Sequence, residues 1–222
     1  MRDIRKNQDY FKKYLDYQYS RIEKKTAKLE DCDNDKKQRV LVSLTGYEVD
    51  LLKAEFSAGA TKMRLSKLLL SAVTYASEYK KITYEDLLVL LSMTVMLKGR
   101  KEIEKIFKDL IVNNRETINK DRLLMYIAAY IEEGKGNWDK TTPLMKDYLL
   151  MEDVFLNKDK EAAMLLYLEK WYSNHKGYAW YDSHLGDSDT YCGYWSFEAA
   201  AIAKILKLDE YKLKESRYYP TL

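Results

Sequence analysis

Residues that interrupt helices are scarce in this chain of 222 residues, which contains two prolines and eight glycines. Proline and glycine are the two residues that most strongly disfavour a helix interior. Apolar side chains also recur every three or four residues, the spacing that places them on one face of a helix. Residues 65–79 show this clearly, with Leu65, Leu68, Leu69, Ala72, Ala76 and Tyr79. We therefore expect an all-α fold of about eight to nine helices.

The expected helices follow from their apolar faces and end signals. The first has an apolar stripe made of Ile4, Phe11, Tyr14, Leu15, Gln18 and Ile22. The second runs from about residue 36 to 57, and Gly59 ends it. Thr83, three residues before Asp86, predicts a capping box that opens a buried helix ending at Gly99. Further helices are expected at 102–112, 120–133, 142–155, 157–172 and 194–208, followed by a short helix and an ordered strap in the tail.

The best domain boundary lies at Gly134 and Gly136, which interrupt the helical pattern where the charge balance changes. Residues 1–136 carry 27 basic and 21 acidic side chains, whereas residues 137–222 carry 11 and 14. The two parts therefore present different electrostatic fields. We expect an N-terminal helical domain, residues 1–134, packed on a C-terminal domain of helical hairpins, residues 135–222.

Overall charge and cysteine content exclude several classes of protein. The formal net charge is +3, too balanced for a general nucleic-acid binder. Cys32 and Cys192 are far apart and form no CxxC pair, which favours reduced structural thiols. The most apolar run, 87–97, is shorter than the roughly 20 residues that cross a bilayer. These features predict a soluble cytoplasmic protein without a membrane segment.

One tract stands apart from the helical pattern. Residues 171–195, WYSNHKGYAWYDSHLGDSDTYCGYW, contain eight aromatic residues and both histidines of the chain. Polar residues and glycines between 174 and 193 predict a loop of roughly 18 residues, and loops of that length are usually functional or disordered. Its aromatic content argues against disorder.

Three interpretations of this tract remain open. In a structural interpretation, four aromatic residues hold the loop to the helices: Trp171, Trp180, Tyr181 and Trp195. Glu198 then lies in the first turn of the next helix, where its charge favours the N-terminus and it bonds backbone donors left free there. In a binding interpretation, the tract presents a surface to a protein partner. The residues of that surface are Tyr178, Asp182, His184, Asp187 and Asp189.

In a catalytic interpretation, Asp182, His184, Asp187 and Asp189 bind a metal ion. Their spacing matches neither the HExxH pair nor the twelve-residue calcium loop. The chain also has no GxSxG motif and no glycine-rich phosphate loop. We therefore expect no catalytic residues, no metal and no cofactor.

Several segments resemble a known family. They are YLEKWYSNHKGYAWYDSH (167–184), GYWSFEAAAIAKILKLDE (193–210) and RYYP (217–220). Together they resemble the C-terminal domain of the PoNi family, the immunity proteins that neutralise PoNe-type polymorphic DNase toxins. The segment YEVDLLKAEFSAG (47–59) and the helix after it are similar to the domain that usually precedes this one.

The resemblance implies an all-helical, non-enzymatic bacterial protein of the cytoplasm. Such a protein binds and inhibits a cognate nuclease that a secretion system delivers between cells. It also implies structural roles for Trp180, Tyr181, Trp195 and Glu198. The net charge of +3 argues against mimicry of DNA by the whole surface. Our hypothesis is stoichiometric occlusion of the nuclease, and the alternatives are a metal-dependent hydrolase that uses residues 182–189 and a helical adaptor or nucleic-acid binder.

Overall fold

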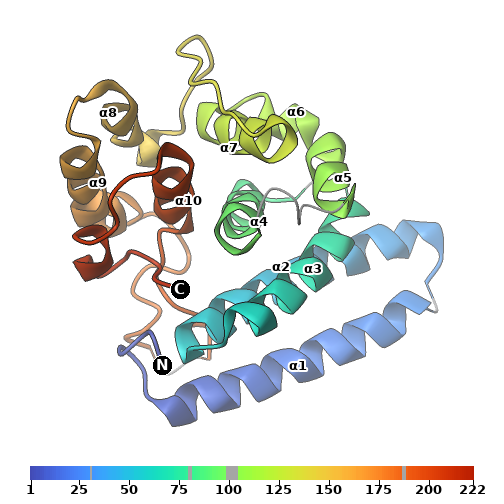
Figure 1. Cartoon of the computed structure of the whole chain (residues 1–222). Coiled ribbons are helices and arrows are strands. Elements are labelled where there is room, and N and C mark those ends of the chain that lie inside the picture. The colour runs from blue at the N-terminus through green and yellow to red at the C-terminus, as the bar shows by residue number, and fades with distance from the viewer. Residues whose placement is uncertain (31, 80–81, 99–104, 187–188) are drawn as a thin grey trace. The chain divides into compact units, whose positions relative to one another are not determined.

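The computed structural model describes all residues of the chain except 31, 80–81, 99–104 and 187–188. Within the described residues there are ten α-helices and no strand, which confirms the all-α prediction. The helices, labelled in Figure 1, are α1 (Gln8–Glu30), α2 (Asn34–Ala58), α3 (Lys62–Ser77), α4 (Tyr84–Leu97), α5 (Lys105–Asn113), α6 (Arg115–Ile118), α7 (Arg122–Glu133), α8 (Met151–Leu156), α9 (Lys160–Asn174) and α10 (Phe197–Leu206). Two short 3-10 helices are η2 (Lys146–Tyr148) and η3 (Leu213–Glu215).

The chain divides into two compact units, neither of which is continuous in sequence. Unit 1 comprises Met1–Leu90, Glu104–Asn114 and Asp182–Gly193. Unit 2 comprises Leu91–Ile103, Arg115–Tyr181 and Tyr194–Leu222. The two domains predicted from sequence, residues 1–134 and 135–222, remain a prediction.

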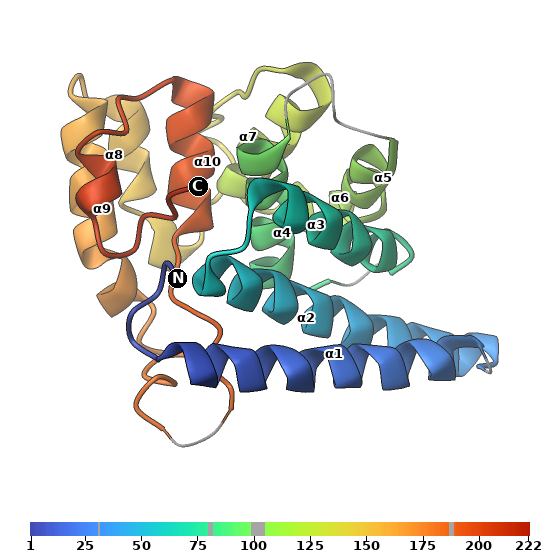
Figure 2. The same ribbon diagram turned by 60° about the horizontal axis from the view of Figure 1, so that its bottom comes forward.

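Unit 1 is built on the antiparallel pair α1 and α2, which lie side by side in Figures 1 and 2. α1 buries Phe11 and Tyr14 on the face predicted from sequence. α2 begins at Asp33, whose side chain accepts a hydrogen bond from the backbone N–H of Lys36, and it ends at Gly59. Gly59 has φ 96°, a left-handed conformation that glycine adopts without steric cost. α3 packs on α2, and α5 packs on α3.

Unit 2 contains the hairpin of α8 and α9, against which η2 and η3 also pack. α7 contacts α10. Asp121 caps the start of α7, and Gly134 ends it with φ 82°. Both ends of α7 therefore carry the local signals that mark helix termini in sequence.

Some expected helix bounds are wrong. No helix begins at Thr142, because the carboxylate of Asp139 accepts hydrogen bonds from both Thr141 and Thr142 and holds a turn there. η2 and α8 follow in place of the expected helix 142–155. Ile4 precedes α1 and is 88% exposed, so it does not belong to the apolar stripe.

Other bounds move by a few residues. Asp159, rather than Asn157, caps α9, and α10 begins at Phe197 rather than at 194. Thr83 does cap α4, since its hydroxyl accepts a hydrogen bond from the backbone N–H of Asp86 at 3.1 Å. The predicted end of that helix, Gly99, lies outside the described residues.

Glu48, buried on α2, makes the stability of unit 1 depend on pH. Its carboxylate accepts one hydrogen bond, from the Ser71 hydroxyl at 2.9 Å. Burial raises the pKa of Glu48 above its ordinary 4.5, and the Ser71 hydrogen bond offsets part of that rise. Folding therefore favours the protonated form, so the free energy of unfolding falls as the pH rises from 4.5 through the higher folded-state pKa.

Glu48→Gln keeps an acceptor for Ser71 but cannot ionise. We expect the variant to melt at the wild-type temperature near pH 4 and a few degrees higher near pH 8, because about 1 kcal/mol shifts the Tm of a chain this long by about 2–4 °C. Thermal unfolding followed by circular dichroism across this pH range measures the difference. A difference between the two melting temperatures that does not change with pH would contradict the assignment.

Of the described residues, none lies in a helix with the length and apolar character that crossing a membrane requires.

Candidate functional site

The aromatic tract connects α9, which ends at Asn174, to α10, which begins at Phe197. The described residues between them form turns and irregular backbone, which confirms that this stretch is a loop. The tract is shared between the two units. Residues 175–181 and 194–196 belong to unit 2, whereas residues 182–193 belong to unit 1. We call residues 182–193 the acidic loop.

A buried carboxylate organises the unit 2 end of the tract. Glu198, in the first turn of α10, is 4% exposed and accepts hydrogen bonds from three side chains. The donors are the Tyr167 hydroxyl at 2.6 Å, the Trp171 Nε1–H at 2.7 Å and the Ser196 hydroxyl at 2.5 Å. Burial and the adjacent Glu198 charge raise the pKa of Tyr167 well above its ordinary value, so this hydroxyl remains a donor.

This arrangement corrects the expected partners of Glu198. The sequence suggested backbone donors at the helix N-terminus, whereas the structure shows side-chain donors, two of them from α9. Tyr167 and Trp171 are four residues apart, so they lie on the same face of α9. That spacing was the one signal in the sequence that could have indicated them.

Stacked rings hold residues 178–181 against α9. The rings of Trp171 and Trp180 are 5.5 Å apart at an interplanar angle of 17°, and those of Tyr172 and Tyr181 are 4.4 Å apart at 24°. Tyr172 also stacks on Tyr218 at 5.4 Å. The rings other than Trp171 are half-buried, and so is Trp195, another aromatic residue predicted to be structural.

Of the predicted partner-binding residues, Tyr178 is the one placed in unit 2. It is half-buried, and its hydroxyl donates to the carboxylate of Asp147 at 3.0 Å. The ring of His175 contacts that of Tyr178, with ring centroids 4.8 Å apart. His175 is buried, and its Nδ1 is 2.6 Å from the carbonyl oxygen of Trp171. Tyr178 is thus held by contacts within unit 2 while part of its ring remains accessible.

The base of the acidic loop is fixed to the first helices of unit 1. Tyr191 is fully buried, and its hydroxyl donates to the carboxylate of Asp3 at 2.5 Å. The Tyr10 hydroxyl is 2.9 Å from both the backbone N–H and the carbonyl oxygen of Tyr191. The Ser57 hydroxyl donates to the carbonyl oxygen of Cys192 at 2.7 Å.

The rest of the acidic loop exposes a different set of side chains. Asp182 is exposed and has φ 58°, a left-handed conformation that aspartate tolerates better than most residues. Its carbonyl oxygen accepts a hydrogen bond from the backbone N–H of Leu185 at 2.9 Å, which closes a turn. Leu185 is 72% exposed, and Asp189 is also exposed.

His184 and Asp187 are the other two residues of the loop that we predicted to bind the partner. His184 is half-buried, with its ring 5.9 Å from that of Tyr191. Asp187 lies outside the described residues. Asp182, His184 and Asp189 therefore share one loop of unit 1, while Tyr178 belongs to unit 2.

Comparison with known families assigns the C-terminal part of the chain. Residues 119–221 match the family described as PoNe immunity proteins (PoNi), C-terminal. The chain carries a PoNi C-terminal domain. This match confirms the resemblance for the matched residues and supports an immunity protein of the PoNe type. Neither a curated protein nor a solved structure matches the chain.

The PoNi match includes the Glu198 network, the aromatic stacks and the whole acidic loop. The segment at 47–59 lies outside the matched residues, so its resemblance to the domain that precedes the PoNi C-terminal domain remains a prediction.

Cys192 of the PoNi domain lies in a polar cluster on α2. Its Sγ is 3.9 Å from Oδ1 of Asp50, which is 3.4 Å from the ammonium of Lys53. Burial raises the pKa of Cys192 to about 11, although Lys53 acts in the opposite direction. A thiol with this pKa is protonated near neutral pH, so Cys192 is a poor nucleophile while it is buried. Across the described residues, no three His, Cys, Asp or Glu side chains are grouped so that they could hold a metal ion.

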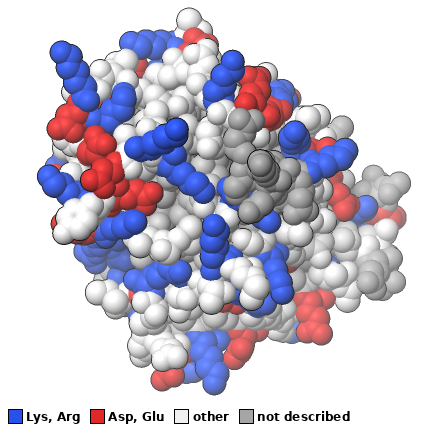
Figure 3. All heavy atoms as spheres, in the orientation of Figure 1, with Lys and Arg blue, Asp and Glu red and all other residues white. Residues whose placement is uncertain are grey.

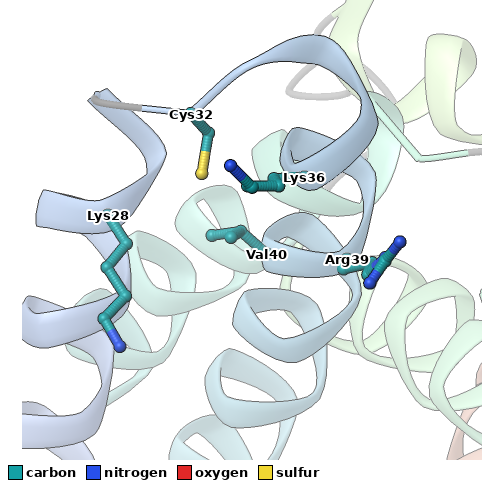
Figure 4. Close-up of a pocket in the computed structure, with 5 residues that line it drawn as sticks. All are labelled: Lys28, Cys32, Lys36, Arg39 and Val40. Carbon is teal, nitrogen blue, oxygen red and sulfur yellow. The ribbon is translucent and has the colours of Figure 1, made fainter.

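A separate pocket of about 410 Å³ lies at the turn between α1 and α2 (Figure 4). It is lined by Lys28, Cys32, Lys36, Arg39 and Val40. Figure 4 shows the charged ends of Lys28 and Arg39 pointing away from the sulfur of Cys32. Lys36 is paired with Asp33 at 3.1 Å. The cationic groups therefore do not converge on a common point, as binding of an anion would require.

Proposed function

We propose that this PoNi protein inhibits a PoNe-type DNase toxin by one-to-one binding, and that its acidic loop contacts the basic DNA-binding face of the toxin. The protein acts without catalysis or a cofactor, in the cytoplasm of the cell that it protects. The observation that carries the proposal is the acidic loop itself. Its base is buried and hydrogen-bonded, while Asp182, Leu185 and Asp189 are exposed to solvent.

The charge of the sequence around the loop suits a basic partner. Residues 182–193 contain three acidic side chains and no lysine or arginine. Lys6 brings a positive charge to the loop, donating to the carbonyl oxygen of Gly186 at 3.2 Å. A nuclease presents lysine and arginine to DNA phosphates, so exposed carboxylates on the loop accelerate the encounter with it.

Charge over the wider surface does not explain inhibition. Figure 3 shows acidic and basic side chains interspersed on the face in view. The formal net charge of +3 has the same sign as the face of a DNA-binding enzyme. Recognition therefore depends on a local acidic segment rather than on the field of the whole protein.

Apolar contact supplies the affinity that charge alone does not. Leu185 is one of the most exposed large apolar side chains among the described residues. Its removal from water in a complex is favourable. Protection from a lethal enzyme requires a Kd near 1 nM or below, about 12 kcal/mol, and a few well-packed side chains account for most of such an energy.

A titration of DNA cleavage tests this function. The purified chain is added in increasing amounts to a PoNe-type DNase toxin, with plasmid cleavage as the readout. We expect cleavage to stop near one molar equivalent, and a complex of the two proteins to elute together from a sizing column. Unchanged cleavage, with the two proteins eluting separately, would contradict the proposed inhibition.

A further inference from the structure

The segment before α1 makes a set of buried contacts with the acidic loop. The carboxylate of Asp3 is 1% exposed and accepts hydrogen bonds from the Tyr191 hydroxyl at 2.5 Å and from the backbone N–H of Arg5 at 2.8 Å. The guanidinium of Arg5 pairs with the same carboxylate at 3.1 Å. Asp3 is thus buried because Tyr191 and Arg5 provide donors for its charge.

α1 continues this set of contacts through Tyr10. A single hydroxyl, that of Tyr10, is hydrogen-bonded to both backbone polar groups of Tyr191. The rings of Tyr10 and Phe11 lie 6.4 and 6.3 Å from that of Tyr191. We call Asp3, Tyr10 and Tyr191, with these contacts, the Tyr191 anchor.

We infer that the Tyr191 anchor fixes the base of the acidic loop, residues 189–193, before the toxin arrives, so that Asp3, Tyr10 and Tyr191 are positioning residues for inhibition. This inference rests on the function proposed above. A loop whose base is already ordered loses less conformational entropy on binding than one whose base must be ordered by its partner. Asp3 and Tyr10 do not have to touch the toxin to affect its affinity, because they act through Tyr191.

Cys192 provides a direct readout of the anchor. It follows Tyr191 in sequence and is 6% exposed. Burial raises its pKa to about 11, so alkylation by iodoacetamide requires the base of the loop to open. The other cysteine, Cys32, is half-buried in the α1–α2 turn, so Cys32→Ser is the background for all measurements.

Two variants break the anchor with minimal change of shape. Tyr191→Phe removes the donor to Asp3, and Tyr10→Phe leaves the two backbone groups of Tyr191 without this partner. For each variant we expect alkylation of Cys192 to accelerate about tenfold or more, since one buried hydrogen bond changes an opening equilibrium by about that factor. We also propose that release of the toxin passes through the same opening of the loop base, so we expect the toxin complex to dissociate faster by a similar factor and bound toxin to slow the alkylation of Cys192.

Tyr167→Phe is the matched control. It also removes a tyrosine hydroxyl bonded to a buried carboxylate, but in unit 2. We expect it to lower the global stability in urea while leaving the alkylation rate of Cys192 in native buffer unchanged. Equal acceleration in the control would show that global unfolding exposes Cys192, and would overturn the inference.

The remaining outcomes separate the anchor from the proposed function. Unchanged alkylation in Tyr191→Phe and Tyr10→Phe would show that these contacts do not hold the loop, and would overturn the anchor whether or not the chain inhibits the toxin. Faster alkylation with unchanged toxin dissociation would overturn the positioning role and the proposed loop contact, while one-to-one inhibition would stand.

Discussion

Glu198→Ala is expected to lower the free energy of unfolding by about 3–5 kcal/mol, the largest effect of any single substitution that we foresee on stability. The variant leaves the donors of Tyr167, Trp171 and Ser196 without their acceptor. An unpaired buried donor costs about 1–3 kcal/mol, and the three losses are not fully additive because the donors share one carboxylate. Urea unfolding of the purified chain, followed by tryptophan fluorescence, measures the change.

Glu198→Gln separates the acceptor from the charge. The amide oxygen of glutamine replaces the carboxylate oxygen that accepts all three hydrogen bonds. We expect a smaller loss than in the alanine variant, since the shape and one acceptor remain. If alanine and glutamine were equally well tolerated, the hydrogen bonds to Glu198 would not be what holds α9 and α10 together.

Leu185→Asp combined with Asp189→Lys is expected to weaken inhibition of the toxin about a hundredfold or more without loss of stability. The first change places a charge where we propose that an apolar side chain is buried, and the second reverses a charge that faces a basic partner. Both side chains are exposed, so the fold does not depend on them. The inhibition constant is measured by DNA cleavage at two salt concentrations. This measurement tests both the apolar contact at position 185 and the charge at position 189.

Glu133→Lys controls for the reversal of one charge at Asp189, since each of these two changes replaces a carboxylate by an ammonium. Glu133 is an exposed residue at the end of α7, where a lysine is favourable for the helix dipole. We expect this control to inhibit like the wild type. Asp182→Asn adds a finer comparison, because asparagine removes the charge and still tolerates φ 58°. An unchanged inhibition constant in the double variant would exclude the acidic loop from the interface.

Sequence patterns identified much of the candidate site but not its organisation. The aromatic and acidic residues of the tract were named, and its loop character is confirmed. Its assignment to two units was not foreseen, because a single stretch of sequence does not indicate which neighbours each half contacts. The roles of Asp182, His184 and Asp189 in binding remain predictions, and Asp187 lies outside the described residues.

Asp3 shows why the contacts that hold the base of the acidic loop could not be predicted from the sequence. It lies in a charged segment that reads as a solvated start of the chain, and its partner Tyr191 is 188 residues away. No periodicity or spacing relates two residues at that separation. Only the packing of the acidic loop against α1 and α2 brings them together and buries the carboxylate.

By itself, the sequence determined the all-α class, the position of the long loop, and the helix ends at Thr83, Gly59 and Gly134. These features depend on side-chain periodicity and on backbone conformations that a few neighbouring residues control. Only the tertiary structure decided which donors surround Glu198 and what holds the base of the acidic loop. Those contacts depend on the long-range packing of helices and loop, because a buried polar group is stabilised by whichever donors the fold places next to it.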